Sequence, residues 1–233
     1  MATYKEIFGT NIEVVSSDPA NPNVGQLWYN TTSQELKGYK QVIGNAWSTG
    51  GNLNTARNQL GSAGTQTAAL GFGGYTGSEI ANTESYNGTS WTALNNLTTA
   101  KRAMGGAGTQ TAALAFGGTP PITAITEQWN GTSWTEVADS NAVRTSTTGA
   151  GHTDTAAMSM GGNSPTAVAL TELWNGTSWS EDTDLNTARE YLVGAGTTAS
   201  ALAFGGLGPP AGLTATEEWT GAGTPVTKTV TTA

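Results

Sequence analysis

The sequence predicts an all-β protein, a β-propeller of four-stranded antiparallel blades with about 44 residues per blade. Three recurring markers support this fold class. In the first, an apolar residue stands before Gly-Gly at intervals of 44 residues, at Phe72, Phe116, Met160 and Phe204. Fixed periods between about 20 and 50 residues are typical of solenoids, propellers and other repeat arrays.

The other two markers fall in the same period. Thr-Glu-x-aromatic recurs with its glutamates at Glu84, Glu127, Glu172 and Glu217. A tryptophan recurs, followed ten residues later by a cation, in the pairs Trp47 and Arg57, Trp91 and Lys101, Trp134 and Arg144, and Trp179 and Arg189. We interpret all of these residues as structural, because a ligand site would more often break the repeat than recur in each copy. For the tryptophans, an aromatic platform for sugars is the alternative.

Each repeat contains four short strand patterns. In the copy between residues 100 and 137 they read AMGGAG, TAALAFGG, ITEQW and SWTEV. Asn-Gly between the last two is a strong hairpin signal, because both residues tolerate positive φ. Four antiparallel strands per repeat is a propeller blade. Glycine and alanine in the first strand suit the crowded axis where blades converge, and the aromatic residues suit the outer strands.

The first 50 residues differ from the repeats. NIEVV, GQLWYN, ELKGYKQV and AWST are four strand patterns, separated in part by the proline-containing turn SSDPANP. We expect residues 1–50 to form a first blade and attachment segment, in one continuous domain with the blades of residues 51–233. Five blades are therefore favoured, and four blades plus an N-terminal hairpin are the alternative. The tail VTKTVTTA either forms the outer strand of the last blade or closes the ring against the N-terminal blade.

Composition limits the partners. The net charge is −8 without a basic run, which argues against nucleic acid and membrane insertion. No apolar stretch is long enough to span a bilayer, and MATYKEIFGT lacks the pattern of a secretory signal. Without cysteine there is no disulfide or thiolate chemistry. We expect no cofactor.

No catalytic or metal-binding constellation is evident. His152 is the only histidine and occupies a hairpin-tip position that holds threonine in the other copies, so we expect it to be exposed. Asp182, Asp184 and Asn186 begin like a calcium loop, but the glycine and the final glutamate are missing. An exposed turn is the preferred interpretation, with a weak calcium site as the alternative. The Asn-x-Thr sequons are interpreted as turns. We expect no enzyme activity.

Loops that follow Gly-Gly differ between copies, over residues 75–82, 119–124, 163–169 and 207–213. In a propeller such loops gather on one face, and variable loops on a rigid scaffold suit recognition. The candidate binding residues are Tyr75, Ser78, Glu79, Thr119, Asn163 and Ser164. Unconstrained drift of the loops is the alternative interpretation.

The order of markers, from Gly-Gly through Glu-x-aromatic and Trp to the cation, resembles the kelch repeat of galactose-oxidase-like propellers over roughly residues 50–220. The repeat is shorter than usual, and Trp/Tyr-Asn-Gly stands where Tyr-Asp-Pro is typical. Copper chemistry of the galactose-oxidase kind would need histidines and a cysteine that this chain lacks.

A second resemblance covers roughly residues 10–40, where SSDPANPNVGQLWYNTTSQELKGYK is similar to a segment of virion and tail proteins of marine tailed phages. It implies a non-enzymatic virion protein, at the tail, the fibre or the capsid surface, used for host attachment or decoration. Its partners would be other virion proteins, copies of itself and a host surface glycan. A glycan-binding lectin is the alternative function, and a carbohydrate-active enzyme the less favoured one.

Overall fold

The computed structural model describes residues 12–23, 25–39, 47–209 and 211–221. These residues form strands and loops without a helix, which confirms the all-β prediction. The chain divides into two compact units, Met1–Thr49 and Gly50–Ala233. The division falls next to the expected boundary, but it separates two units where one continuous domain was expected.

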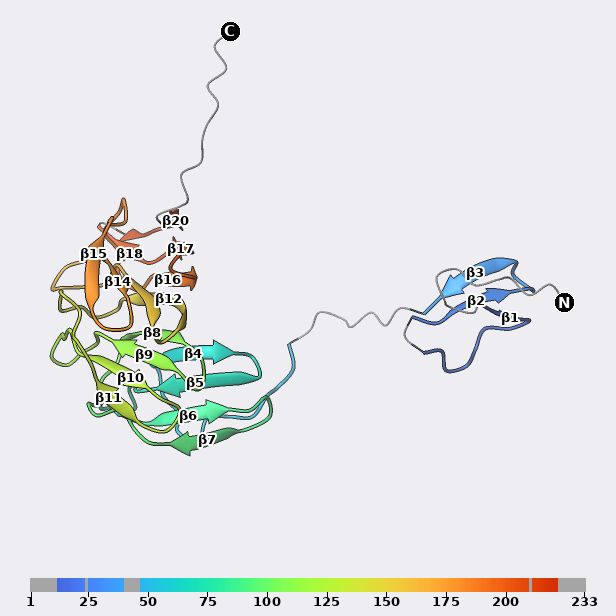
Figure 1. Ribbon diagram of the computed structural model, residues 1–233, viewed down its shortest axis with the longest axis horizontal. Coiled ribbons are helices and arrows are strands. Elements are labelled where there is room, and N and C mark those ends of the chain that lie inside the picture. The colour runs from blue at the N-terminus through green and yellow to red at the C-terminus, as the bar shows by residue number, and fades with distance from the viewer. Residues whose placement is uncertain (1–11, 24, 40–46, 210, 222–233) are drawn as a thin grey trace, which may run out of the picture. The chain divides into compact units, whose positions relative to one another are not determined.

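The described residues of the second unit form four sheets of three or four strands in sequence order, called repeat sheets 1 to 4, and one two-stranded hairpin (Figure 1). Sheets 1 to 3 each have four antiparallel strands in chain order. Their strands are β4 (Gly61–Thr65), β5 (Ala68–Phe72), β6 (Thr83–Tyr86) and β7 (Trp91–Leu94); β8 (Gly105–Gly108), β9 (Ala113–Phe116), β10 (Thr126–Trp129) and β11 (Trp134–Glu136); and β12 (Thr148–Thr153), β13 (Ala156–Met160), β14 (Thr171–Trp174) and β15 (Trp179–Asp182).

Repeat sheet 4 has three described strands, β16 (Val193–Gly196), β17 (Ser200–Phe204) and β20 (Thr216–Thr220). The short hairpin of β18 (Leu207–Gly208) and β19 (Ala211–Gly212) lies between β17 and β20 in the chain. The tail predicted as an outer strand or ring closure, VTKTVTTA, lies outside the described residues. Four strand patterns per repeat are thus confirmed for three repeats.

The Asn-Gly hairpins form as expected, but with four-residue loops instead of two-residue ones. Tyr86 pairs with Trp91 across the loop of residues 87–90. The Asn87 side chain accepts hydrogen bonds from the backbone N–H groups of Thr89 and Ser90. Gly88 has a φ of 92°. The asparagine thus closes an Asx turn and the glycine supplies the left-handed backbone.

The described strands of the N-terminal unit do not form the four-stranded antiparallel sheet that was expected of a first blade. Its sheet contains β1 (Glu13–Val15), β2 (Leu27–Asn30) and β3 (Glu35–Gly38), and β1 pairs with β2 in parallel. Parallel pairing needs a crossover, and the proline-containing connection between these strands supplies it. In that connection, Asp18 accepts hydrogen bonds from Trp28, Asn30 and Lys37. Residues 47–49 form no strand.

The first strands of the four repeat sheets lie next to one another, β4 beside β8, β8 beside β12 and β12 beside β16. Glycine makes this approach possible. A Cβ atom on Gly106 would stand 2.4 Å from the Ser62 carbonyl oxygen, and one on Gly149 would stand 2.2 Å from the Gly106 carbonyl oxygen. The small residues of the first strands therefore permit the close approach of these strands, which fits the crowding expected from their composition.

Replacing Gly149 by alanine is expected to lower the free energy of unfolding by about 1–3 kcal/mol, because backbone must move to admit the new methyl group. Gly212→Ala is the matched control, since its Cβ would have only Leu207 Cδ2, at 4.0 Å, nearby. Urea unfolding of both variants measures the difference. An equal effect of the two substitutions would contradict the close approach of β8 and β12.

Candidate functional site

The repeated glutamates and cations pair with each other inside each repeat. Arg57 pairs with Glu84, Lys101 with Glu127, Arg144 with Glu172, and Arg189 with Glu217. Three of the pairs have side chains that are almost completely buried, and Glu217 of the fourth is only slightly exposed. Each glutamate lies on the third strand of its sheet and each cation in the connection that precedes the first strand. The pairs therefore fasten the connections to the sheets.

Buried charges need their hydrogen-bonding capacity filled, and the Arg144 pair shows how this is achieved. Arg144 Nη2 donates to Glu172 Oε1 at 2.7 Å, and Nη1 donates to the carbonyl oxygens of Gly161 and Leu170. The other oxygen of Glu172 accepts from the backbone N–H of Asn141 at 2.7 Å and from its side-chain amide. Both oxygens of the carboxylate are thus satisfied.

Lysine in the second repeat makes a poorer pair than arginine. Lys101 Nζ is 3.3 Å from Glu127 Oε1, yet this oxygen has no hydrogen-bond partner within the described part of the chain. A guanidinium presents several donors in a fixed plane, whereas an ammonium is a point charge. Burial lowers the pKa of Lys101, and the charge of Glu127 offsets this only in part. Burial also lowers the pKa of Arg144 against the opposing charge of Glu172.

Neighbouring repeats meet through glycines and tryptophans. Gly74 N–H donates to the carbonyl oxygen of Lys101 in the next repeat, and a Cβ on Gly73 would stand 2.6 Å from that oxygen. The Trp134 ring packs edge-on against Phe72 with a centroid distance of 4.9 Å, and its Nε1 donates to Thr83 Oγ1. Phe116, Thr126 and Trp179 repeat this arrangement between sheets 2 and 3. The other two marker tryptophans differ from this pattern, because Trp91 is partly buried against Tyr86 of its own sheet and Trp47 is fully exposed.

A further link was not predicted from the sequence. Ala103 N–H donates to the Gln59 carbonyl, Ser146 N–H to the Ala103 carbonyl, and Tyr191 N–H to the Ser146 carbonyl. All four residues have a φ between 52° and 54°, although none is glycine. Non-glycine residues rarely adopt this backbone, and their side chains gave no signal for it. We call this chain of hydrogen bonds the belt.

The loops after Gly-Gly, called the rim loops, are held along the belt side of each repeat. The residue after Gly-Gly pairs with the residue after the cation in every copy, giving the pairs Asn58 and Tyr75, Arg102 and Thr119, Thr145 and Asn163, and Glu190 and Leu207. The predicted binding residues Tyr75, Thr119 and Asn163 are thus bridge residues whose backbones are structural. Ser78 is exposed, and Ser164 donates its N–H to the Thr166 carbonyl inside its loop.

Tyr75 and Glu79 meet a residue that sequence analysis did not single out. The Arg102 guanidinium lies 4.4 Å from the centre of the Tyr75 ring, and its Nε lies 3.4 Å from Glu79 Oε1. Arg102 belongs to the second repeat, whereas its two partners lie in the first rim loop. The first rim loop is thereby locked to the next repeat.

A shallow groove of about 340 Å³ lies between the third and fourth rim loops. Asn163, Pro165 and Thr166 line one side, and Glu190, Leu207 and Pro209 line the other. Amide, hydroxyl and carboxylate groups lie here next to proline and leucine surface. The groove brings together the predicted Asn163 and residues from a neighbouring loop, which spacing in the sequence could not show.

His152 and the run of residues 181–186 were the candidates for catalysis and metal binding. His152 is exposed and lies at the cavity where the first strands converge. Asp184 accepts the Thr171 backbone N–H, and Asn186 donates its backbone and side-chain N–H groups to the Glu217 carboxylate. Within the described residues, no three His, Cys, Asp or Glu side chains gather as a metal site would require. In the same residues, no helix is long and apolar enough to span a membrane.

The chain matches no protein-family model, and no curated protein is significantly similar to it.

Removing one partner of a buried ion pair leaves the other charge unpaired, at a cost of about 3–5 kcal/mol. We expect this loss of stability for Arg144→Met. Arg102→Met is the matched control, since Arg102 is partly exposed and its pair with Glu79 should contribute at most about 1 kcal/mol. Chemical unfolding measures both variants. Similar losses would show that the buried pairs are no more important than surface ones.

Acid should unfold the protein partly through Glu84. Burial by itself raises the pKa of this carboxyl, but hydrogen bonds from the Asn54 backbone and from Arg57 hold the pKa below its ordinary value of 4.5. A lowered pKa in the folded state stabilises the fold above the unfolded-state value, and this contribution is lost as the pH falls through the folded-state pKa.

We therefore expect the unfolding free energy to fall below about pH 4.5, with a shallower slope for Glu84→Gln than for the wild type. Glu181→Gln removes an exposed carboxyl and should keep the wild-type slope. Thermal unfolding between pH 3 and pH 7 gives these slopes. Identical slopes for wild type and Glu84→Gln would refute the assignment.

Proposed function

We propose that the chain is a non-enzymatic recognition and display protein, in which the repeat sheets act as kelch-like propeller blades and the rim loops make contact with a partner. One observation carries this proposal. The ion pairs that fasten each connection to its sheet recur in every copy, whereas the rim loops differ in sequence but are fastened by the same bridge. A fixed scaffold that positions different loops suits binding better than catalysis.

The resemblance of residues 10–40 to phage virion proteins supports a place in a virion, at a tail, a fibre or the capsid surface. The N-terminal unit, with its own three-stranded sheet, would attach the protein to other virion proteins. The second unit would then be the part that contacts the host or decorates the particle.

A surface glycan is the second candidate partner, and the groove between the third and fourth rim loops favours it. Asn163, Thr166 and Glu190 provide the amide, hydroxyl and carboxylate groups that sugar hydroxyls hydrogen-bond with, and Pro165 and Leu207 provide apolar surface. The proposed site is thus a shallow groove with neighbouring polar and apolar parts.

A glycan array with the labelled full-length chain tests this assignment. We expect binding to a small set of glycans, with a loss of at least about tenfold in affinity for a variant carrying Asn163→Ala and Glu190→Ala. Ser78→Ala and Thr76→Ala, in the first rim loop, form the matched control and should bind normally. Binding that survives the groove substitutions would move the site elsewhere, and no binding to any glycan would leave display without sugar recognition.

A further inference from the structure

The two ends of the row of repeat sheets differ from its interior. The second strands β5, β9 and β13 are largely buried on both faces, but β17 alternates between exposed and buried residues. Leu202 and Phe204 are 38% and 37% exposed, whereas the corresponding Leu70 and Phe72 are 1% and 0% exposed. In sheets 1 to 3 this face is covered by the next sheet. On sheet 4 it is an apolar face without a neighbour among the described residues.

The hydrogen-bonding groups that join repeats also lack partners at this end. The joint between sheets 1 and 2 and the joint between sheets 2 and 3 each use a belt carbonyl, a glycine N–H and a threonine hydroxyl of the preceding repeat. The corresponding groups of the last repeat are the Tyr191 carbonyl, the Gly206 N–H and the Thr216 hydroxyl. None of the three has a hydrogen-bond partner within the part of the chain that the structure describes.

The first repeat carries the complementary groups. Its belt N–H is that of Gln59, its cation carbonyl is that of Arg57, and its tryptophan is Trp91. These three also lack the partners from a preceding repeat that Ala103, Lys101 and Trp134 have. Trp91 is only partly buried, in contact with Tyr86 of its own sheet. The unpaired donors and acceptors of the first repeat thus match the unpaired acceptors and donors of the last repeat.

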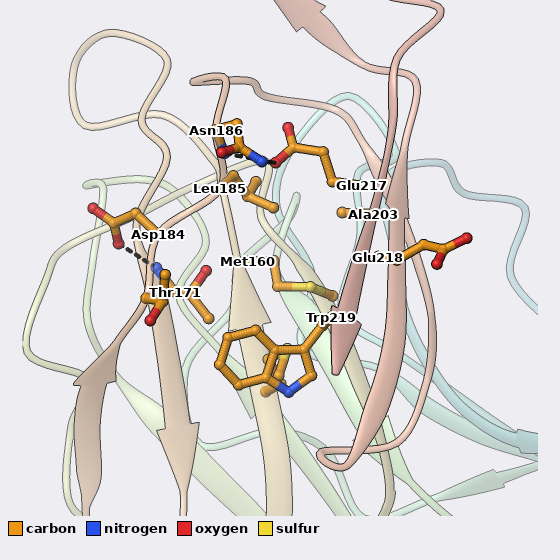
Figure 2. Close-up of a pocket in the computed structure, with 11 residues that line it drawn as sticks. Met160, Thr171, Asp184, Leu185, Asn186, Ala203, Glu217, Glu218 and Trp219 are labelled. Carbon is orange, nitrogen blue, oxygen red and sulfur yellow. Dashed lines mark hydrogen bonds between the residues drawn. The ribbon is translucent and has the colours of Figure 1, made fainter. Parts of the chain in front are cut away.

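A pocket between sheets 3 and 4 adds a second, independent fit (Figure 2). It has a volume of about 140 Å³, and Met160, Thr171, Leu185 and Trp219 are among the residues that line it. These residues correspond in the repeat to Phe72, Thr83, Leu97 and Trp129. The latter belong to the surroundings of the Trp134 indole. The pocket therefore has the surroundings of a tryptophan side chain, but no side chain of the described residues fills it.

Trp47 is a marker tryptophan whose side chain is not buried by any of the described residues. The last repeat lacks the NGTSW sequence that places Trp134 and Trp179 on the fourth strands, and TGAGTP stands there instead. Trp47, by contrast, is fully exposed and stands ten residues before Arg57, the spacing that separates Trp134 from Arg144. In the interior, this spacing puts the tryptophan on the sheet that precedes the cation's own repeat. By this spacing in the sequence, Trp47 is the counterpart of the fourth-strand tryptophans Trp134 and Trp179.

We propose that two copies of this chain associate head to tail, with repeat sheet 4 of one copy packed against repeat sheet 1 of the second. Phe204 then meets Trp91 of the second copy, and Thr216 accepts the indole N–H of that tryptophan. Trp47 of the second copy fills the pocket of Met160, Thr171 and Trp219. Each contact copies one that the chain already makes between its own sheets.

A second copy is the occupant because, among the described residues, the groups that join one repeat to the next have no partner at either end of the row. Two chains contribute eight repeat sheets, which is within the four to eight blades typical of propellers. Contacts between unlike faces close into a ring when the rotation between neighbours allows it, so both joints of a ring of two would be the same.

Light scattering after size-exclusion chromatography of the full chain tests the proposal. We expect a mass of twice the 23.7 kDa of one chain. Phe204→Glu and Trp47→Ala should each weaken the association at least about tenfold, because they remove aromatic anchors of the joint. Both side chains are exposed in the single chain, so the circular dichroism spectrum and the melting of the single chain should persist.

Val143→Glu is the matched control, since it places the same charge at an exposed apolar residue of an interior connection, and it should keep the doubled mass. Larger assemblies that Phe204→Glu dissolves would support the same joint. A mass of one chain at all concentrations would overturn the proposal. A doubled mass that neither substitution affects would also overturn it, because the interface would then lie elsewhere.

Discussion

The buried pair of a glutamate and a cation is the interaction on which the other features of each repeat depend. Removing two charges from water is costly, and the cost is met here because the carboxylate and the guanidinium are surrounded by donors and acceptors. The carboxylate of Glu172, for example, binds both Arg144 and the backbone N–H of Asn141. One carboxylate therefore fixes two points of the connection, three residues apart, against the third strand of its sheet.

The neighbouring features follow from this fixed connection. The residue after the cation bridges to the rim loop, and the next residue but one after the cation enters the belt with a left-handed backbone. The carbonyl of the cation accepts the N–H of the second glycine in the preceding repeat, so that a side chain on the first glycine would collide with it. Gly-Gly and the cation, two separate markers in the sequence, are thus two halves of one joint.

Much of the fold could be predicted from the sequence because each marker has a local physical meaning. The strand positions in repeats 1 to 3 and the Asn-Gly hairpins depend on residues close in the chain. The structural interpretation of Glu84 and its counterparts comes instead from their recurrence in every copy, since each pairs with a cation 26 to 28 residues away. The parallel pairing of β1 with β2 could not be predicted, since strand patterns do not specify direction. The belt, the Arg102 cluster and the empty tryptophan pocket depend on contacts between repeats, which spacing alone does not show. Of the predicted binding residues, Asn163 lies at a groove, and Tyr75 and Glu79 contact Arg102.

Amide hydrogen exchange at Asn54, Thr98, Asn141 and Asn186 tests the central role of the ion pairs most directly. These four residues lie in loops and are exposed overall, but each donates its backbone N–H to a glutamate that pairs with a cation. We predict that the four amides exchange as slowly as those of the central strands, because they open only when the repeat unfolds. Exchange as fast as that of the exposed loop amide of Gly77 would contradict the account.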